Sequence, residues 1–272
     1  MSDTIQRFHQ LHRAGCFVIP NPWDVGSARL LVQLGFPAVA TTSAGFAWSL
    51  GRPDNHVTVD EAIAHFRAIA QSVDVPVNAD FEGGFAIDPS GVADNVTRAV
   101  ATGVAGLSIE DSTGESASPL FDFALSVERI TAARRAIDAS GTSVLLTGRS
   151  EGFIVGRPDL AETIRRLTAY AQAGADCLYA PGITKDDEIE AVVKAVAPKP
   201  VNVLVNDGFA TVQRLAQLGV RRISVGGALA RAAWAGFLQA AKEIAEQGTF
   251  AALGRGTPGR ELNKAFAELL RR

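Results

Sequence analysis

The chain has 272 residues, of which 47% are hydrophobic and 20% are charged, and its formal net charge is −3. These values exclude an intrinsically disordered chain, and the length is typical of a single α/β barrel. The small net charge gives no indication of a nucleic-acid-binding surface, and no stretch reaches the roughly 18 consecutive apolar residues of a membrane span. The N-terminal residues show no apolar signal segment, so we expect a cytoplasmic protein with no membrane and no nucleic-acid partner.

Eight short apolar or β-branched runs recur along the chain, and each is followed by a polar or glycine-rich break and then a helical pattern. The runs cover residues 16–21, 38–43, 75–80, 106–111, 144–149, 177–182, 200–205 and 221–227. Apolar strands that alternate with amphipathic helices are typical of a parallel sheet buried on both faces. Eight such units predict a single (β/α)₈ TIM barrel, in one domain over residues 1–272.

The helices between these runs carry recognisable start and stop signals. Thr58 and Glu61 form a capping-box pattern at the start of a helix predicted over residues 59–73. Gly174 and Gly219 follow predicted helices at 160–173 and 211–218, in the position that favours a left-handed backbone. Beyond the eighth strand, residues 228–272 are predicted to form a helical extension that packs on the barrel or on a neighbouring subunit.

The third apolar run ends in Asp80, Phe81 and Glu82, followed by Gly83 and Gly84. Alternate residues of a strand share a face, so Asp80 and Glu82 point the same way if the strand continues to residue 82. Two carboxylates on one face suit Mg²⁺, which binds oxygen ligands and keeps several waters. The alternative interpretation is a pair of solvated loop acids.

Polar side chains gather where the other predicted strands end, which is where (β/α)₈ enzymes carry their active sites. These residues are Thr42, Ser43, Gly45, Asp54, Glu110, Asp111, Arg149, Glu151, Asn202, Asn206 and Ser224. Several acids surround one obvious cation, Arg149, and would repel one another unless a divalent metal or shared protons neutralised them. A metal beside an arginine suits a 2-oxo acid, because the ion stabilises negative charge that develops as a neighbouring bond breaks.

Several motifs resemble the isocitrate lyase/phosphoenolpyruvate mutase family, and more closely its phosphonomutase-like branch. They are Pro-Asn-Pro-Trp-Asp at 20–24, Thr-Thr-Ser-Ala-Gly at 41–45, Gly-Arg-Pro-Asp at 51–54, Pro-Val-Asn-Ala-Asp-Phe-Glu-Gly-Gly at 76–84, Leu-Ser-Ile-Glu-Asp at 107–111 and Arg-Arg-Ile-Ser-Val-Gly-Gly at 221–227. The similarity extends over roughly residues 5–245. It implies Mg²⁺ as cofactor, with Mn²⁺ as a substitute, and a homo-dimer or homo-tetramer that exchanges its C-terminal helices.

The resemblance also assigns metal-site and catalytic residues. Asp80 is similar to the principal metal carboxylate of the family, with Glu82 and Glu110 acting mainly through metal-bound water. Glu110, Asp54 and Arg149 are the catalytic candidates implied, and Arg149 also matches a substrate-binding arginine.

The remaining candidates implied by the resemblance are substrate-binding residues. Thr42, Ser43, Ala44 and Gly45 lie in the segment whose backbone donors hold substrate oxygens, and Asn202 matches a contact on the seventh strand. Arg231 is implied as a further anion contact, and the alternative interpretation, a charge on a helix surface, is favoured.

Two departures from the family pattern bear on the reaction. Lyases that cleave isocitrate or methylisocitrate carry a Lys-Lys-Cys-Gly-His loop after the fourth strand, whereas residues 113–122 here contain no cysteine. At 180–182 the chain has Ala-Pro-Gly where those lyases place a glutamate. These two lyase activities are therefore disfavoured, although the 113–122 segment remains a candidate lid.

We therefore predict a Mg²⁺-dependent lyase or phosphonomutase-like enzyme that cleaves or forms a C–C or C–P bond adjacent to a 2-oxo acid, through a metal-stabilised enolate. Oxaloacetate-like and phosphonopyruvate-like substrates both remain open. The alternative hypothesis is a non-catalytic barrel that binds a 2-oxo acid as a sensor or scavenger. A Schiff-base aldolase is disfavoured, because none of the eight runs contains a lysine.

Overall fold

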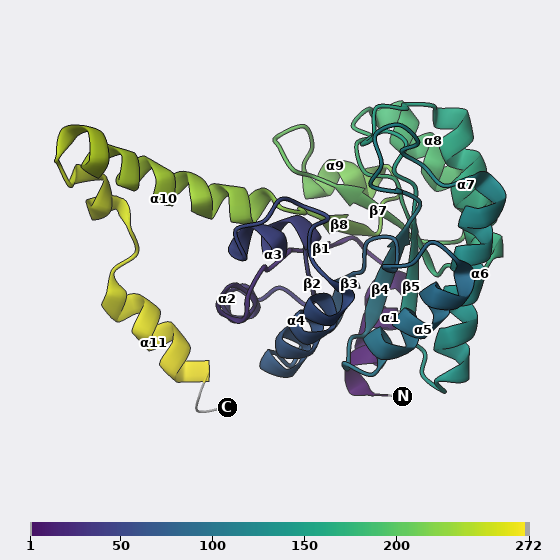
Figure 1. Ribbon diagram of the computed structural model, residues 1–272, viewed down its shortest axis with the longest axis horizontal. Coiled ribbons are helices and arrows are strands. Elements are labelled where there is room, and N and C mark those ends of the chain that lie inside the picture. The colour runs from purple at the N-terminus through teal and green to yellow at the C-terminus, as the bar shows by residue number, and fades with distance from the viewer. Residues whose placement is uncertain (1, 270–272) are drawn as a thin grey trace.

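The computed structural model describes residues 2–269 and contains one eight-stranded parallel sheet (Figure 1). The strands are β1 (Phe17–Ile19), β2 (Val39–Ala40), β3 (Val77–Asp80), β4 (Gly106–Glu110), β5 (Leu145–Arg149), β6 (Cys177–Tyr179), β7 (Val201–Leu204) and β8 (Arg222–Ser224). Their order is β1-β8-β7-β6-β5-β4-β3-β2, so β1 and β2 form the two ends of the ladder. The backbone N–H of Ala40 donates to the carbonyl of Pro20 at 3.0 Å across this gap. The predicted (β/α)₈ barrel is confirmed.

Helices alternate with the strands along the chain. They are α1 (Asp3–Arg13), α2 (Val25–Gln33), α3 (Ser43–Ser49), α4 (Val59–Ser72), α5 (Pro89–Val100), α6 (Phe123–Ala139), α7 (Leu160–Gln172), α8 (Asp186–Val196), α9 (Val212–Gln217), α10 (Ala228–Gln247) and α11 (Gly259–Leu269), with a 3₁₀ turn at Ala251–Arg255. The Thr58 and Glu61 capping box of α4 is present as predicted. Gly174 and Gly219 follow α7 and α9 with φ of +105° and +89°, so both stop signals are confirmed.

The strands divide their side chains between the surrounding helices and the barrel interior. On β4, Leu107 and Ile109 are fully buried with the core-facing residues Ile130 and Ile137 of α6. Ser108 and Glu110, which alternate with them, belong to the opposite face. Because the outward faces supply the apolar core, the interior near the carboxyl ends of the strands is free to carry polar groups.

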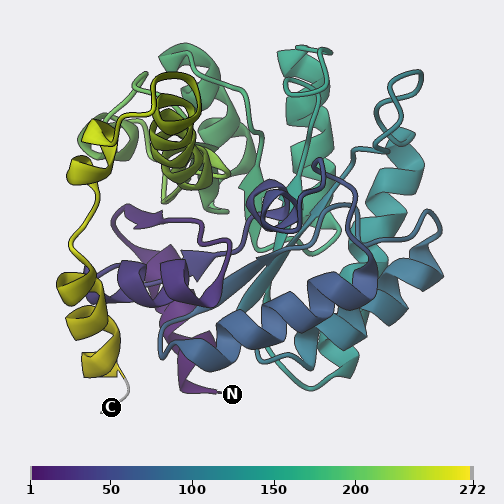
Figure 2. The same ribbon diagram turned by 60° about the vertical axis from the view of Figure 1, so that its left-hand side comes forward.

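The C-terminal elements extend away from the barrel. Helix α10 projects as an arm, and α11 returns to lie beside α2 (Figures 1 and 2), where Gln33 Nε2 donates to the carbonyl of Ala265 at 2.5 Å. The predicted helical extension is therefore observed as α10 and α11, while residues 270–272 of the predicted last helix lie outside the described residues. Among residues 2–269, no helix is both long and apolar enough to cross a membrane.

Candidate functional site

A cavity of about 150 Å³ lies within the barrel, at the carboxyl ends of the strands. Its lining includes Asn21, Thr41, Thr42, Ser43, Ala44, Asp54, Asn78, Asp80, Ser108, Arg149, Tyr179, Asn202, Arg222 and Ser224. A cavity of this size holds a molecule about as large as benzene, so it suits a small organic acid. The strand ends therefore enclose a polar site for a small ligand.

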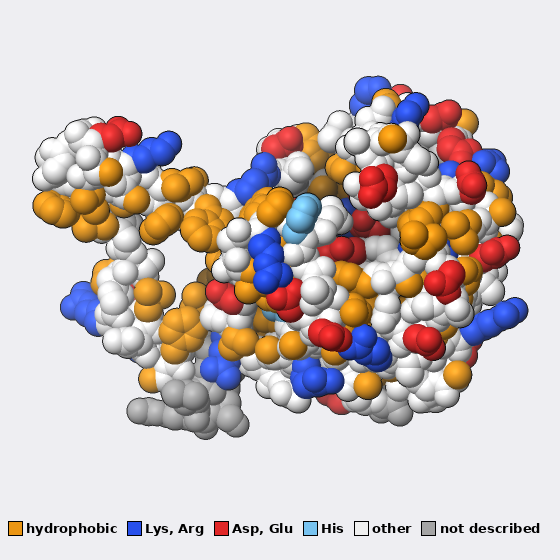
Figure 3. Space-filling model, viewed as in Figure 1, with side chains coloured by type: hydrophobic (Ala, Val, Ile, Leu, Met, Phe, Trp, Pro, Cys, Tyr) orange, Lys and Arg blue, Asp and Glu red, His pale blue; other side chains and the backbone are white. Residues whose placement is uncertain are grey.

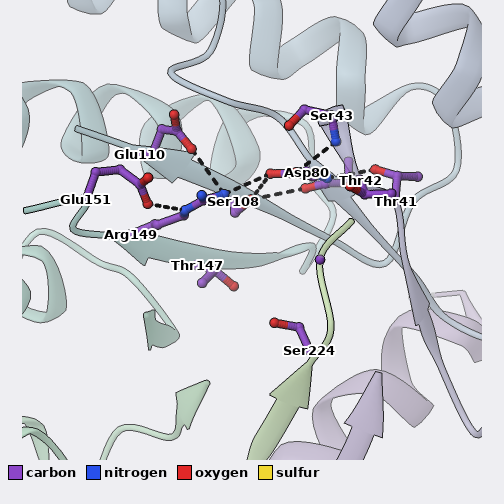
Figure 4. Close-up of polar contacts among 12 residues, drawn as sticks. Thr41, Thr42, Ser43, Asp80, Ser108, Glu110, Thr147, Arg149, Glu151 and Ser224 are labelled. Carbon is purple, nitrogen blue, oxygen red and sulfur yellow. Dashed lines mark hydrogen bonds and ion pairs between the residues drawn. The ribbon is translucent and has the colours of Figure 1, made fainter. Parts of the chain in front are cut away.

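Arg149, at the end of β5, is the centre of the charged groups (Figure 4). Its Nη1 lies 3.3 Å from Asp80 Oδ1 and 3.1 Å from Glu110 Oε2, and its Nε donates to Glu151 Oε1. Burial acts to lower the pKa of this guanidinium, but the charges of Glu110 and Glu151 raise it well above its ordinary value. Arg149 is thus a permanent cation shared by three carboxylates.

Asp80 reaches this cluster from the end of β3. Its Oδ2 accepts the backbone N–H of Ser43 at 3.0 Å, and its backbone N–H donates to Thr41 Oγ1 at 2.9 Å. Ser108 of β4 donates weakly to Asp80 Oδ1 at 3.5 Å. These contacts fix the carboxylate at the junction of β2, β3 and β4.

Strand β3 ends at Asp80, as the predicted run 75–80 does, so the condition for Asp80 and Glu82 to share a strand face is not met. Glu82 adopts a left-handed backbone with φ of +46°, followed by Gly84 with φ of +76°. The turn nevertheless returns the Glu82 carboxyl to the acidic cluster, where its buried Oε1 has no hydrogen-bond partner among residues 2–269. Burial, followed by the charge of Asp80, raises the pKa of Glu82 to about 8.

The other acids of the cluster also hold protons tightly. Burial, followed by the charge of Asp80, raises the pKa of Asp54. Burial likewise raises the pKa of both Glu110 and Glu151, against the opposing effect of Arg149. Asp54, Asp80, Glu82, Glu110 and Glu151 therefore place more negative charge around Arg149 than one guanidinium neutralises.

This donor set fits a hard divalent cation. The cluster offers carboxylate oxygens, one of them the unpartnered Oε1 of Glu82, and burial together with neighbouring carboxylates raises the pKa values of Glu82 and Glu110. Among the described residues 2–269, no three Asp, Glu, His or Cys side chains are arranged to ligate one ion together. Mg²⁺ is commonly bound through one or two carboxylates, with water and substrate oxygens completing its shell. The arrangement thus suits Asp80 as the direct ligand, with the glutamates acting through water.

The segment after β2 begins a short helix. Thr42 is the N-cap of α3, and its side chain accepts the N–H of Gly45. Gly45 is buried, packs closely against Thr42 and Trp23 and does not line the cavity, so its contact with a substrate stays a prediction. Thr42, Ser43 and Ala44 line the cavity as predicted, although the Ser43 N–H is bonded to Asp80.

The two remaining substrate-binding candidates, Asn202 and Arg231, differ in their position relative to the cavity. Asn202 of β7 lies at the cavity and donates to Ser224 Oγ at 2.9 Å. Arg231, on α10, is exposed and donates to the carbonyl of Asn206 at 3.0 Å, outside the cavity lining. The position of Arg231 agrees with the alternative interpretation of a charge on the helix surface, and its substrate contact stays a prediction.

Sequence reasoning missed several cavity residues, among them Tyr179 and Arg222. Tyr179 ends β6, and its ring lies 5.1 Å from the guanidinium carbon of Arg149. Burial raises the pKa of the Tyr179 phenol to about 12, so it acts as a neutral donor. Arg222 was detectable from strand alternation, because it shares a face with Ser224.

A second cavity, of about 460 Å³, lies between the acidic cluster and the loop after β4. It shares Ser43, Asp54 and Arg149 with the first cavity and is also lined by Glu115. Figure 3 shows acidic side chains gathered around a hollow on this face of the molecule. The loop after β4 therefore borders the approach to the charged site.

Asp111 lies beside the site but has a structural role. Its Oδ2 accepts from Tyr170 Oη at 2.7 Å and from Arg166 Nη1 at 3.1 Å, and its Oδ1 accepts the N–H of Glu151 at 2.8 Å. All of its described contacts are within the protein, and it is absent from the lining of both cavities. Asp111 therefore positions Glu151 from behind.

Comparisons with known proteins agree with these features. The sequence model of a family described as phosphoenolpyruvate phosphomutase matches residues 8–245. An uncharacterized protein of Mycobacterium tuberculosis is 35% identical over 80% of this chain and 81% of its own length. Oxaloacetate decarboxylase of Pseudomonas entomophila is 29% identical over 81% of this chain and 78% of its own. The solved structure of a candidate lyase/mutase from Burkholderia cenocepacia is 48% identical, with a TM-score of 0.94, over 97% of this chain and 96% of its own.

Proposed function

Because this chain belongs to the phosphoenolpyruvate phosphomutase family, within the isocitrate lyase/phosphoenolpyruvate mutase superfamily, we propose that it is a divalent-metal-dependent enzyme that cleaves or forms a C–C or C–P bond adjacent to a 2-oxo acid. Relatives named as lyases, decarboxylases and mutases support an enzyme of the lyase or mutase type. The observation that carries the proposal is the excess of buried carboxylates around Arg149 at the strand ends.

Asp80, Glu82 and Glu110 would hold the ion, with Mg²⁺ the expected metal and Mn²⁺ a substitute. When bound, the ion would supply Lewis-acid stabilisation of the negative charge that develops on a 2-oxo acid as the adjacent bond breaks. Its positive charge would also offset the repulsion by Asp80 that, after burial, raises the pKa of Glu82.

The protein's own groups orient the substrate and carry its proton. The Nη2 group of Arg149 has no hydrogen-bond partner within residues 2–269, so it can donate to a substrate oxygen while Nη1 and Nε hold the acids. Asp54 lines both cavities and has a raised pKa, which suits a carboxyl that transfers a proton between the reacting carbon and the outer cavity. We assign Asp54 this proton-transfer role in place of the missing cysteine.

The decisive experiment measures turnover of a panel of 2-oxo acids, including oxaloacetate and phosphonopyruvate, with Mg²⁺ and with a chelator. We expect turnover of at least one acid with Mg²⁺, and a loss of about 100-fold or more in the Asp80→Asn variant. Asp94→Asn, which changes an exposed acid on α5, is the matched control and should retain full activity. Equal turnover by the wild type and Asp80→Asn would refute the proposal, and tight binding with no turnover of any acid would favour the sensor or scavenger hypothesis instead.

A further inference from the structure

Arg222 places a second cation inside the barrel, below the acidic cluster. It is only 3% exposed, yet it lines the cavity. Its Nε donates to Asn202 Oδ1 at 2.8 Å, its Nη2 donates to Thr147 Oγ1 at 3.1 Å, and its Nη1 lies 3.4 Å from His12 Nε2. These contacts hold the guanidinium in one orientation.

This cation has no counter-charge of its own. Across residues 2–269, no carboxylate lies within ion-pair distance of Arg222, whereas Arg149 pairs with three acids and Arg166 with Asp111 and Glu162. Its neighbour His12 is neutral, because burial and then the charge of Arg222 lower the pKa of that ring to about 3. A buried charge without a partner is costly, so an anion from outside the chain would be strongly stabilised there.

The guanidinium has the donors to bind such an anion. An arginine carries five N–H groups in a planar fork, and the three contacts above use one on each nitrogen. One N–H on Nη1 and one on Nη2 are left without a described partner. Two donors in one plane match the two oxygens of a carboxylate better than the tetrahedral oxygens of a phosphonate.

Its depth separates this group from the acidic cluster. Thr147 precedes Arg149 by two residues on β5, which is about 6.6 Å along the strand. The bond to Thr147 therefore places the Arg222 guanidinium deeper in the barrel than the backbone of Arg149. Figure 4 shows Thr147 and Ser224 set apart from the group formed by Asp80, Arg149 and Glu110. The cavity is therefore acidic at its mouth and positive at its floor.

We propose that Arg222 is a substrate-binding residue that pairs with a second carboxylate, at the end of the substrate that points into the barrel. The enzyme accordingly selects 2-oxo dicarboxylic acids over 2-oxo monocarboxylic acids. This inference rests on the proposed function for the identity of the ligand, but the binding of a dicarboxylate at Arg222 is measured without turnover.

The test compares malate with lactate by titration calorimetry in the presence of Mg²⁺. The two probes share a 2-hydroxy acid group and differ in the second carboxylate. Wild-type protein should bind malate at least about 30-fold more tightly than lactate, as expected for a buried charge-assisted pair. Arg222→Met should remove this preference while its lactate affinity stays within about twofold of wild type, and Arg222→Lys should retain part of it.

Arg221→Met is the matched control, because Arg221 precedes Arg222 on the chain, is only partly buried and donates to the carbonyl of Gly15, outside the cavity lining. It should keep the full preference for malate. Equal affinity of the wild type for the two probes, or an undiminished preference in Arg222→Met, would overturn the inference. If Arg222→Met does not fold, the wild-type comparison and the Arg222→Lys variant still decide it.

The two proposals fail in different ways. If turnover requires Mg²⁺ and Asp80 while malate binding is unaffected by the substitution of Arg222, only the role of Arg222 is refuted. A preference for malate that depends on Arg222, in a protein that turns over no 2-oxo acid, would refute only the proposed reaction.

Discussion

Nη1 of Arg149 lies 3.3 Å from Oδ1 of Asp80, although strand β4 separates the strands that carry them. The contact crosses the mouth of the barrel and joins β3 to β5 above Ser108 of β4. Because the same Nη1 group also contacts Glu110, the guanidinium keeps several like charges together that would otherwise repel one another. The stability of the barrel mouth therefore depends on Arg149.

Replacing Arg149 with methionine removes the cation and leaves its carboxylates buried. We expect a loss of about 3–5 kcal/mol in the free energy of unfolding at pH 8, measured with denaturant. The loss should be smaller at pH 5, because protonation removes the uncompensated charges. Arg98→Met is the control, since it breaks an exposed pair with Asp60 and should cost less than about 1 kcal/mol. Similar losses in the two variants would contradict the central role of Arg149.

Glu82 predicts a pH dependence of stability in metal-free protein. Its folded-state pKa of about 8 lies above the ordinary value of 4.5, so the folded state binds the proton more tightly than the unfolded state. The resulting stabilisation is fully present below pH 4.5 and is lost as the pH rises toward 8. Glu82→Gln should therefore flatten the fall in Tm between pH 5 and 8 and raise the stability at pH 8 by a few kcal/mol, on the order expected for such a shift.

Added Mg²⁺ should raise the stability of the wild type at pH 8, as Glu82→Gln is expected to do. A cation that binds the ionised cluster stabilises the folded state in proportion to its occupancy, so Tm should rise more at pH 8 than at pH 5. A wild-type Tm that is flat from pH 5 to 8 without metal would contradict the assigned environment of Glu82.

The fold was predictable because the barrel needs a repeated local pattern. Each strand is an apolar run, and stop signals such as Gly174 and Gly219 adopt the left-handed backbone expected of them. The predicted strands are longer than the observed ones, because β2 pairs through only Val39 and Ala40 before the chain turns into α3. Periodicity locates a strand, whereas its end is set by the turn that follows.

The site was predictable only in part, because contacts across the barrel leave no local signal. The spacing of Asp80 and Glu82 indicated one strand face, but the turn at residue 82 brings the carboxyl to the cluster by another route. The Gly45 N–H donates to Thr42, the N-cap of α3, and the predicted run at 38–43 gave no signal that a helix begins at residue 43. Arg222 stood in an apolar run as one of two adjacent arginines, and only strand alternation separates the interior one from Arg221.

The variant Tyr170→Phe tests whether Asp111 stabilises the fold rather than binding the ligand. The Tyr170 hydroxyl donates to Asp111 at 2.7 Å, and Tyr170→Phe removes this bond while Arg166 still pairs with the carboxylate. We expect a loss of about 1.5 kcal/mol in the free energy of unfolding. The affinity for oxalate in the presence of Mg²⁺, used as a probe that mimics the enolate, should be unchanged. Tyr179→Phe is the contrasting variant, since Tyr179 lines the cavity and its change should weaken oxalate binding more than stability. A large loss of oxalate affinity in Tyr170→Phe would place Asp111 in the binding site.

Helix α10 carries the prediction for the assembly, which we propose is a homo-oligomer formed by packing this arm against a second copy of the chain. Ala230 is the only buried residue in this 20-residue helix among the described part of the chain, while Trp234 and Phe237 are 38% and 59% exposed. Hydrophobic side chains follow the arm along its length (Figure 3), and an apolar surface of this kind marks a protein interface. The exchange would involve α10 and α11. Helix α10 leads away from the barrel and carries α11, which packs against α2.

Light scattering at micromolar concentration should therefore give a dimer or a tetramer. Phe237→Asp should shift the protein to monomers by about 100-fold or more in the dissociation constant, since a carboxylate would be buried in an apolar contact. Lys242→Gln, an exposed position on the same helix, should leave the assembly intact and control for general effects on α10. A monomeric wild type would refute the assembly, and an oligomer that is indifferent to Phe237→Asp would place its interface on a surface other than this arm.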